Sequence, residues 1–268
     1  MNSKLIFLHA LTPVHAGTGQ AASVVDLPVA REKATSWPVI PSSTVKGVLR
    51  DEVDETTAKR VFGTMEASGR IGLTDQRTLF LAVRSMFGIF AYVTCPYALT
   101  RLKRDAASLG CSLMLPEIPD VRDDSILVTG DTVLTQNQKV FLEDYDLKTA
   151  PLSADLASAL STALFTDREE KVSFESRVAI VSDTIFTFLC ETSLEVTAKI
   201  ALDDTTKNVV NGALWYEEAV PAETIFVGAA VALFPSETLD DLKHLDGTVV
   251  QLGGKSTTGK GLCRVKLS

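Results

Sequence analysis

The chain is built from short apolar runs separated by turn-forming segments, a pattern typical of strands mixed with helices. Residues 4–14 are rich in branched apolar side chains and predict a buried first strand, and residues 224–234 predict another. Residues 126–134 and 139–142 predict a hairpin around a polar turn, and the polar stretch 203–208 predicts the tip of a second hairpin. Similar runs predict further strands over residues 79–83, 89–94, 184–189, 194–202 and 262–267.

Apolar residues at helical spacing predict a helix over residues 44–53, with residues 42–43, both serines, as its N-cap. Lys46 and Arg50 lie four residues apart and therefore share one side of that helix, away from the apolar stripe. Gly47 weakens a helix relative to alanine, so its presence suggests that some backbone approaches closely there. The same spacing predicts further helices over residues 97–108, 154–165 and 236–245, the first with a basic face.

Short strands interspersed with helices favour an α+β fold. The last predicted strand, residues 262–267, can return to the centre of a sheet, which is typical of a ferredoxin-like α+β sandwich. The sequence has no internal repeat and no long low-complexity linker. We therefore expect a single domain over residues 1–268 with inserted loops.

The composition is that of a globular protein. Hydrophobic residues make up 46% and charged residues 22% of the 268 residues, which excludes a disordered or collagen-like chain. The longest apolar run is half of the roughly 20 residues that a membrane span needs, and the first residues predict a strand rather than a signal peptide. The four cysteines are scattered and the three histidines have no ligand-like spacing. We therefore expect free thiols in a reducing cytoplasm and no zinc site.

Charge is distributed unevenly along the chain. The formal net charge of −8 argues against a stand-alone nucleic-acid-binding protein, because phosphate neutralisation supplies most of the affinity of such proteins. Two segments are nevertheless basic. Residues 250–268 hold four basic side chains and no acidic one, and residues 28–50 hold four basic side chains and one acidic one. These segments predict a basic stripe on an acidic body.

The glycine-rich segment 253–261 resembles a nucleotide-binding loop without satisfying its pattern. Residues 254–260 fit GxxxxGK, but Gly261 replaces the Ser or Thr that binds magnesium, and a strand-like run follows instead of a helix. Residues 17–22 fit GxGxxA, but a β-branched run ending in proline follows them. These departures exclude an ATPase and a nicotinamide site. The glycine-rich segment can still bind a phosphodiester, because glycines expose backbone N–H groups and its two lysines add charge.

Several segments together resemble one known family. The most specific are residues 25–32 (VDLPVARE) and 91–96 (AYVTCP), whereas the glycine-rich loop 252–261 is general to the superfamily. With them, the chain is similar over most of its length to the fourth Cmr subunits, the repeated backbone proteins of type III-B CRISPR effector complexes in the RAMP superfamily. The other matching segments are residues 15–19, 38–50, 87–90 and 212–218.

The resemblance implies a ferredoxin-like (RRM-like) palm with an inserted thumb hairpin, in copies that stack into a filament along a guide crRNA. Each thumb then displaces a base pair of the guide–target duplex, and the target RNA is cut nearby, at regular intervals, with a divalent metal ion (Mg²⁺ or Mn²⁺). The implied partners are crRNA, single-stranded target RNA, further copies of the chain and other Cmr subunits, in the cytoplasm and without a membrane. Affinity shared among many copies explains why no single chain needs to be basic. We predict the thumb at residues 176–181 or in the longer insertion before them.

The resemblance assigns catalysis to the loop that carries Asp26, which is also the predicted ligand of the metal ion. His15 is predicted as an acid, a base or a phosphate contact. Glu217, or its neighbour Glu218, is predicted to complete a small acidic site, although the family often has a tyrosine where this chain has Ala219. One aspartate without a fixed metal cage implies catalysis mainly by in-line positioning. Judged without the resemblance, a turn-capping Asp26 and a structural His15 are the plainer interpretations.

The contacts to the guide RNA are expected on the first helix, on the glycine-rich loop and beside them. An ordinary solvated helix face is the alternative interpretation of the two helix residues. No sequence readout is expected, since pairing with the guide supplies the specificity. The predicted RNA-binding residues, with Lys33 close by, are Arg31, Lys46, Arg50, Lys255, Ser256, Thr257 and Lys260.

Two other functions stay open at this point. The first is an architectural crRNA-binding subunit without cleavage activity, which differs from the cleaving subunit in its response to Asp26→Asn. The second is a stand-alone enzyme that binds a phosphate-containing ligand through the glycine-rich loop. It predicts that the isolated chain binds a nucleotide.

Overall fold

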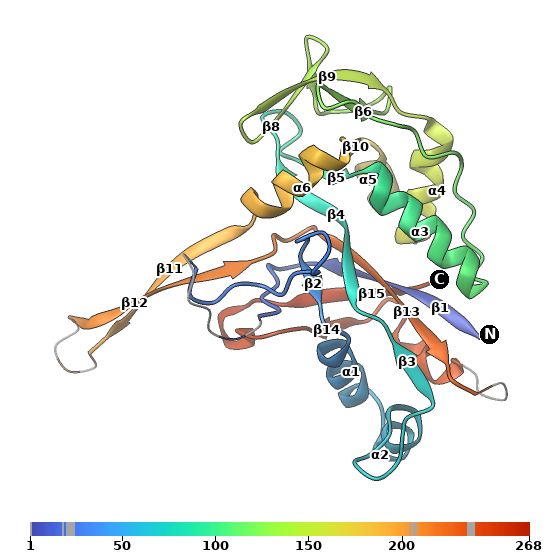
Figure 1. The fold of residues 1–268 in the computed structure, drawn as a ribbon, viewed down its shortest axis with the longest axis vertical. Coiled ribbons are helices and arrows are strands. Elements are labelled where there is room, and N and C mark those ends of the chain that lie inside the picture. The colour runs from blue at the N-terminus through green and yellow to red at the C-terminus, as the bar shows by residue number, and fades with distance from the viewer. Residues whose placement is uncertain (1, 18, 20–24, 204, 206–207, 235–238) are drawn as a thin grey trace.

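The computed structural model describes residues 2–17, 19, 25–203, 205, 208–234 and 239–268, and in this part of the chain thirteen strands form one mixed sheet (Figure 1). The strands are β1 (Ser3–Ala10), β2 (Val39–Ile40), β3 (Ile71–Leu73), β4 (Gln76–Arg84), β5 (Phe90–Thr94), β6 (Ser125–Val128), β7 (Thr135–Gln136), β8 (Lys139–Leu142), β9 (Tyr145–Pro151), β10 (Val178–Ile180), β13 (Ile225–Ala232), β14 (Val249–Gln251) and β15 (Leu262–Leu267). Along the sheet their order is β14-β15-β1-β13-β4-β5-β10-β6-β9-β8-β7, with β2 beside β4 and β3 beside β13.

The helices lie on both sides of this sheet. In the view of Figure 1, α1 and α2 lie below β14 and β15, whereas α3 to α6 lie above β1 and β13. None of the helices in the described residues is both long and apolar enough to cross a bilayer. The helices are α1 (Ser42–Asp51), α2 (Glu55–Thr57), α3 (Pro96–Leu109), α4 (Ala154–Leu164), α5 (Arg168–Glu175) and α6 (Asp183–Thr192), with short helical turns η1 (Ala58–Phe62), η2 (Asp240–Leu245) and η3 (Ser256–Thr258).

Four antiparallel strands in the order β15-β1-β13-β4 form the centre of the sheet. Leu8 of β1 lies opposite Phe226 of β13 and Val265 of β15, and all three are fully buried. Consecutive residues of β1 are buried as well, so both faces of the sheet are covered there. The sheet with its helices confirms the predicted α+β class.

A two-stranded hairpin, β11 (Glu195–Leu202) and β12 (Val209–Ala219), projects from the rest of the molecule (Figure 1). Its register places Ile200 opposite Leu214 and Ala198 opposite Tyr216 on one face, and Ile200 and Leu214 are 50% and 55% exposed. The base of the hairpin is tied to the main body, because Val220 pairs with Val14. The strand predicted over residues 194–202 is therefore confirmed as β11.

The prediction of a strand over residues 184–189 is wrong, because these residues lie in α6. Ser182 caps this helix, and its hydroxyl accepts a hydrogen bond from Ile185 N–H at 3.3 Å. Helical spacing, rather than the alternation of a strand, explains which side chains of the segment face the core. The buried ones are Ile185, Phe186, Leu189 and Cys190.

The first of the two predicted positions of the thumb, residues 176–181, is wrong. The segment contains β10, all of whose residues are buried, and β10 pairs with β5 and β6 inside the sheet. A segment with neighbours on both edges cannot project, whereas β11 and β12 form a separate two-stranded sheet.

Several boundaries differ from their predictions for local reasons. The first helix starts at Ser42, and its N-cap is Pro41 rather than a serine, because Asp75 Oδ1 accepts the Ser42 N–H at 2.7 Å and takes over the capping. The strand predicted over 126–134 ends at Val128.

The hairpin predicted from residues 126–134 and 139–142 is wrong, because β6 pairs with β9 and β10 rather than with β8. β7 and β8 form a hairpin whose two turn residues, Asn137 and Gln138, have the positive φ that a tight turn needs. Of the helix predicted over residues 236–245, residues 240–245 form η2, and residues 236–238 lie outside the described residues. The four cysteines are free, as expected.

Candidate nucleic-acid interface

Three consecutive residues of β12, Tyr216 to Glu218, are the point where the predicted catalytic residues meet. Asp26 reaches β12 through Oδ2, which accepts a hydrogen bond from Tyr216 N–H at 2.8 Å. His15 reaches it through Nδ1, which lies 2.6 Å from the carbonyl oxygen of Glu218. Asp26 and Tyr216 are 190 residues apart in the sequence. The fold therefore brings Asp26, His15 and Glu217 to one place.

The segment around Asp26 runs alongside β12 for a short distance. Leu27 N–H donates to Tyr216 O at 3.1 Å, and Leu27 O accepts from Glu218 N–H at 3.0 Å. The pairing does not continue as a regular strand, because Val29 N–H donates to Glu218 Oε2 at 2.9 Å and Glu218 O accepts from His15 Nδ1 instead. The result is an isolated bridge with half-buried Asp26 at its start, which leaves the carboxylate at the surface of the junction.

His15 is a buried side chain whose hydrogen bond fixes the role of Nδ1. A carbonyl oxygen only accepts, so Nδ1 of His15 carries a proton and donates to Glu218 O, which makes Nε2 the nitrogen that accepts in a neutral ring. Space beside Nε2 depends on Gly17, since a Cβ at residue 17 would lie 2.7 Å from that atom. The backbone of His15 also accepts a hydrogen bond from Gly254 N–H at 2.9 Å. His15 therefore links β12 to the glycine-rich loop.

Glu217 is engaged by neighbouring side chains. Its Oε1 accepts hydrogen bonds from Trp215 Nε1 at 2.8 Å and from Lys255 Nζ at 2.7 Å, and the side chain is 5% exposed. Burial favours protonation, but the hydrogen bonds from Lys255 and Trp215 outweigh it, so the pKa of Glu217 lies below its ordinary value. Glu217 is thus an ionised partner of Lys255.

The glycine-rich loop between β14 and β15 folds closely against His15. Gly253 has a φ of 80°, and a Cβ there would lie 2.4 Å from His15 O, so only glycine fits this approach. Ser256 and Thr257 are exposed in the single turn η3. The first turn of a helix leaves backbone N–H groups without acceptors inside the helix. This turn therefore presents hydroxyl and N–H donors at the surface.

The two predicted loop lysines contact the base of the hairpin. Lys255 pairs with Glu217 of β12, and Lys260 Nζ lies 3.6 Å from a carboxylate oxygen of Glu195 in β11. The side chain of Lys260 is only 13% exposed. Both positive charges are therefore largely balanced within the chain, and they fasten the loop to the projecting hairpin.

The predicted RNA contact Arg31 is surrounded by protein partners. Its Nη2 donates to Glu218 Oε1 at 2.8 Å, and its Nη1 donates to the carbonyl oxygens of Ser36 and Cys190, each at 2.9 Å. Its neighbour Lys33 is exposed. The geometry gives Arg31 a structural role beside the site.

Lys46 and Arg50 lie on the exposed face of α1, and within the described residues neither forms an ion pair. Gly47 lies between them, and no atom of the described chain comes within 4 Å of the place where its Cβ would be. The expected close approach of backbone from within the chain is therefore absent from the described residues. α1 packs beside β14, the strand that leads into the glycine-rich loop.

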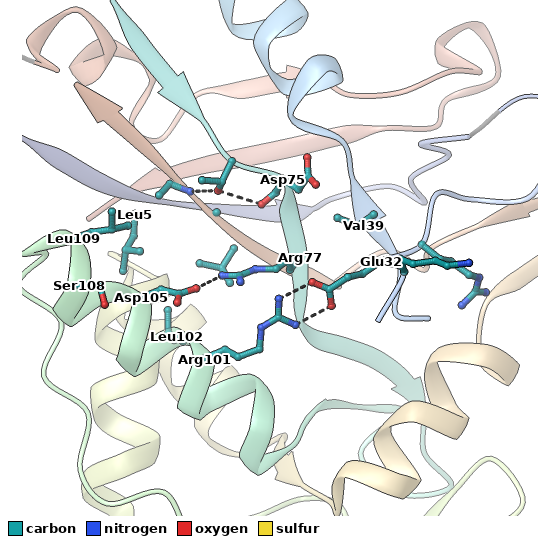
Figure 2. Close-up of a pocket in the computed structure, with 16 residues that line it drawn as sticks. Leu5, Glu32, Val39, Asp75, Arg77, Arg101, Leu102, Asp105, Ser108 and Leu109 are labelled. Carbon is teal, nitrogen blue, oxygen red and sulfur yellow. Dashed lines mark hydrogen bonds and ion pairs between the residues drawn. The ribbon is translucent and has the colours of Figure 1, made fainter. Parts of the chain in front are cut away.

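A cavity of about 570 Å³ lies between α3 and the sheet. Figure 2 shows Arg101 of α3 reaching Glu32, with bonds of 2.5 and 2.8 Å, and Arg77 of β4 reaching Asp105 at 2.5 Å. The hydrogen bonds from Arg101 hold the pKa of Glu32 below its ordinary value. The basic face predicted for this helix is thus partly neutralised, and Glu32 fixes the segment that follows the Asp26 loop.

The residues fit a weakly held cation rather than a caged one. No group of three His, Cys, Asp or Glu side chains in the described part of the chain is arranged to hold a metal ion. Asp26 offers one carboxylate, of which Oδ2 is already bonded to Tyr216 N–H. Mg²⁺ commonly keeps several waters and takes one or two carboxylates plus substrate phosphates, which a single aspartate can satisfy.

The sequence named Glu218 only as an alternative to Glu217 in a small acidic site, and did not indicate its contacts with the segment after Asp26. Its side chain and backbone contact the segment just after Asp26, as well as His15. The adjacent acids 217–218 were a visible signal. Their opposite orientations follow only from the alternation of side chains along β12.

Comparisons relate the chain to known proteins over nearly its whole length. The model of the RAMP superfamily matches residues 7–264. The chain is 34% identical to the "CRISPR system Cmr endoribonuclease Cmr4" of Pyrococcus furiosus over 100% of this chain and 96% of that protein. The crystal structure of oligomeric Cmr4 from the same organism has a TM-score of 0.80, with 30% identity and coverage of 100% and 98%. A chain in the cryo-EM structure of the type III-B Cmr-beta complex bound to cognate target RNA has a TM-score of 0.77 at 20% identity, covering 100% and 97%, and shares the fold.

Proposed function

Since the chain belongs to the RAMP superfamily and, within it, to the Cmr4 family, we propose that it is a repeated backbone subunit of a cytoplasmic type III-B CRISPR ribonucleoprotein. In this role it binds guide crRNA and cleaves complementary target RNA at regular intervals. The observation that carries the proposal is the meeting of Asp26 and His15 on residues 216–218 of β12, next to the glycine-rich loop. Its partners are crRNA, single-stranded target RNA, further copies of the chain and other Cmr subunits.

The central sheet supports a ferredoxin-like palm. In that fold four antiparallel strands arise as β-α-β-β-α-β and stand in the order 4-1-3-2. The order β15-β1-β13-β4, with α1 after β1 and η2 after β13, follows this arrangement. The hairpin of β11 and β12 takes the part of the thumb, since it projects from the palm and starts beside Asp26.

The guide RNA lies along α1 and the glycine-rich loop. Lys46 and Arg50 supply charge that is not balanced within the described residues, and Ser256 and Thr257 supply donors for phosphate oxygens. Lys255 and Lys260 act mainly by fastening the loop, because each is paired with a carboxylate. The described part of each copy offers few unpaired cations to the guide RNA, so the affinity for the guide is shared among many copies along a filament.

Asp26 and His15 carry the chemistry. Asp26 orients the attacking 2′-hydroxyl of the target RNA at the strained linkage, and it is the residue that would hold a divalent cation, Mg²⁺ or Mn²⁺. Such a cation supplies charge stabilisation to the phosphate when it is bound. Nε2 of His15, with Nδ1 fixed by Glu218 O, can accept a proton or, once protonated, contact a phosphate oxygen. Glu217 supports the site through Lys255.

The test is cleavage by the complex reconstituted with guide RNA and a labelled complementary target. Asp26→Asn preserves shape but removes the charge, so we expect cleavage to fall at least a hundredfold while target binding stays within twofold. Asp120→Asn, at an exposed aspartate of the surface, is the matched control and should cleave normally. Normal cleavage by Asp26→Asn would instead identify an architectural crRNA-binding subunit.

A further inference from the structure

Glu218 of β12 holds the segment that follows Asp26 and the imidazole of His15. Its backbone N–H donates to Leu27 O at 3.0 Å, and its Oε2 accepts the Val29 N–H at 2.9 Å. Its carbonyl oxygen accepts from His15 Nδ1 at 2.6 Å. One residue thus makes hydrogen bonds to the segment just after Asp26 and to the nearby histidine.

The side chain of Glu218 has no surface left for RNA. It is 7% exposed, and both of its oxygens are used, Oε2 by Val29 and Oε1 by Arg31. A buried carboxylate needs a charged partner as well as hydrogen bonds. Arg31 supplies that charge, and it is itself held by the carbonyl oxygens of Ser36 and Cys190. Glu218 therefore cannot contact a phosphate or hold a cation in this arrangement.

These contacts set the register between the Asp26 segment and the hairpin. Asp26 and the next residue, Leu27, both contact β12. A shift of residues 27–31 along β12 would therefore move the Asp26 carboxylate as well. The side chain of Glu218 fixes residues 29 and 31, and its backbone fixes residue 27. Positioning within fractions of an ångström is what in-line attack requires.

We propose that Glu218, with Arg31, is a positioning residue for cleavage: it places Asp26 and His15 without touching RNA. The proposal rests on the proposed function, because it names a support for the same site. It also reassigns Arg31 from an RNA contact to a structural partner of Glu218.

The test uses Glu218→Gln in the reconstituted complex. Glutamine can still accept the Val29 N–H but cannot neutralise Arg31. We expect the single-turnover cleavage rate to fall at least tenfold, with target and guide affinities within twofold of the original. Hydrogen–deuterium exchange of the isolated chain should quicken in residues 25–31 and stay unchanged in the central strands β1 and β13.

Two further variants make the test robust to misfolding. Arg31→Gln removes the charged partner of Glu218, which is the more exposed member of the pair. It should slow cleavage and quicken exchange in residues 25–31 less than Glu218→Gln does. The double variant Glu218→Gln with Arg31→Gln should cleave little more slowly than Glu218→Gln alone. Glu143→Gln breaks a more exposed Glu–Arg pair, with Arg84 at 2.9 Å, in the turn between β8 and β9. This matched control should leave both cleavage and exchange at residues 25–31 unchanged.

The outcomes separate this inference from the proposed function. Normal cleavage by Glu218→Gln, alongside the loss caused by Asp26→Asn, would overturn the positioning role and leave the proposed function standing. A fall in guide binding and faster exchange in β1 and β13 would also overturn it, because Glu218 would then support the whole fold. Normal cleavage by Asp26→Asn would refute the proposed function itself.

Discussion

Removal of Lys255 should destabilise the protein in a pH-dependent way, because Lys255 neutralises the buried carboxylate of Glu217. In Lys255→Met most of the side chain remains, but the carboxylate of Glu217, which is 5% exposed, keeps its charge and loses its cationic partner. Trp215 Nε1 still donates a hydrogen bond to it. Breaking a fully buried pair costs about 3–5 kcal/mol. Since Lys255 is itself a third exposed, water can replace part of its effect, and we expect a loss of about 2 kcal/mol in the free energy of unfolding.

The pH dependence gives this prediction its sign. In the native protein the pKa of Glu217 lies below its ordinary value, so its ionised form stabilises the fold above about pH 4.5, and that stabilisation is lost as the pH falls through the folded pKa. Without Lys255, fewer favourable contacts with the carboxylate oppose the effect of burial, so the pKa of Glu217 rises. The difference between native protein and variant should therefore be largest at pH 7 and shrink toward acidic pH.

Thermal unfolding of the isolated chain measures this difference. About 2 kcal/mol corresponds to a fall in Tm of roughly 4–8 °C for a chain of this size. Lys255→Met combined with Glu217→Gln should recover part of the loss, because no buried charge is then left unpaired. An unchanged Tm at pH 7, or an equal fall at pH 7 and pH 5, would refute the ion-pair account of Lys255.

Three further predictions concern the RNA surface, the histidine and α6. Lys46→Ala with Arg50→Ala should weaken guide RNA binding and reduce its log–log salt slope by about 1–2, with little change in Tm; an unchanged slope would show that neither contacts phosphate. Gly17→Ala should displace the His15 ring and slow cleavage at least fivefold at unchanged RNA affinity, and a normal rate would show that the position of Nε2 does not matter. Ser182→Ala should cost about 1 kcal/mol of stability in chemical unfolding, because α6 loses its cap; the cap assignment fails if the midpoint does not move.

The sequence predicted the elements whose patterns are local. Residues 262–267 form β15 within the predicted limits, and residues 194–202 form β11 because alternation and a polar tip define a hairpin without help from distant residues. The strand predicted at 184–189 is wrong, because six residues of apolar and threonine side chains fit both periods, and the serine at residue 182 caps a helix there. The thumb prediction failed because edge pairing, which decides whether a strand projects, depends on the whole sheet.

The site could be predicted only in part for the same reason. Asp26 lies in a specific motif and His15 in another segment that matches the family, and the structure brings them together on β12. The state of the charged residues was beyond the sequence: Arg31 and Lys255 have carboxylate partners nearly two hundred and nearly forty residues away, respectively. Only the folded structure distinguishes a cation that is free for phosphate from one that is already paired.

The most direct measurement of the central claim uses complexes reconstituted from mixtures of native and Asp26→Asn chains, with an end-labelled target RNA. If each copy cuts the linkage beside its own Asp26, every product of the regularly spaced ladder should fall in proportion to the native fraction, with the spacing unchanged. A full ladder from complexes that contain only Asp26→Asn chains would contradict the account.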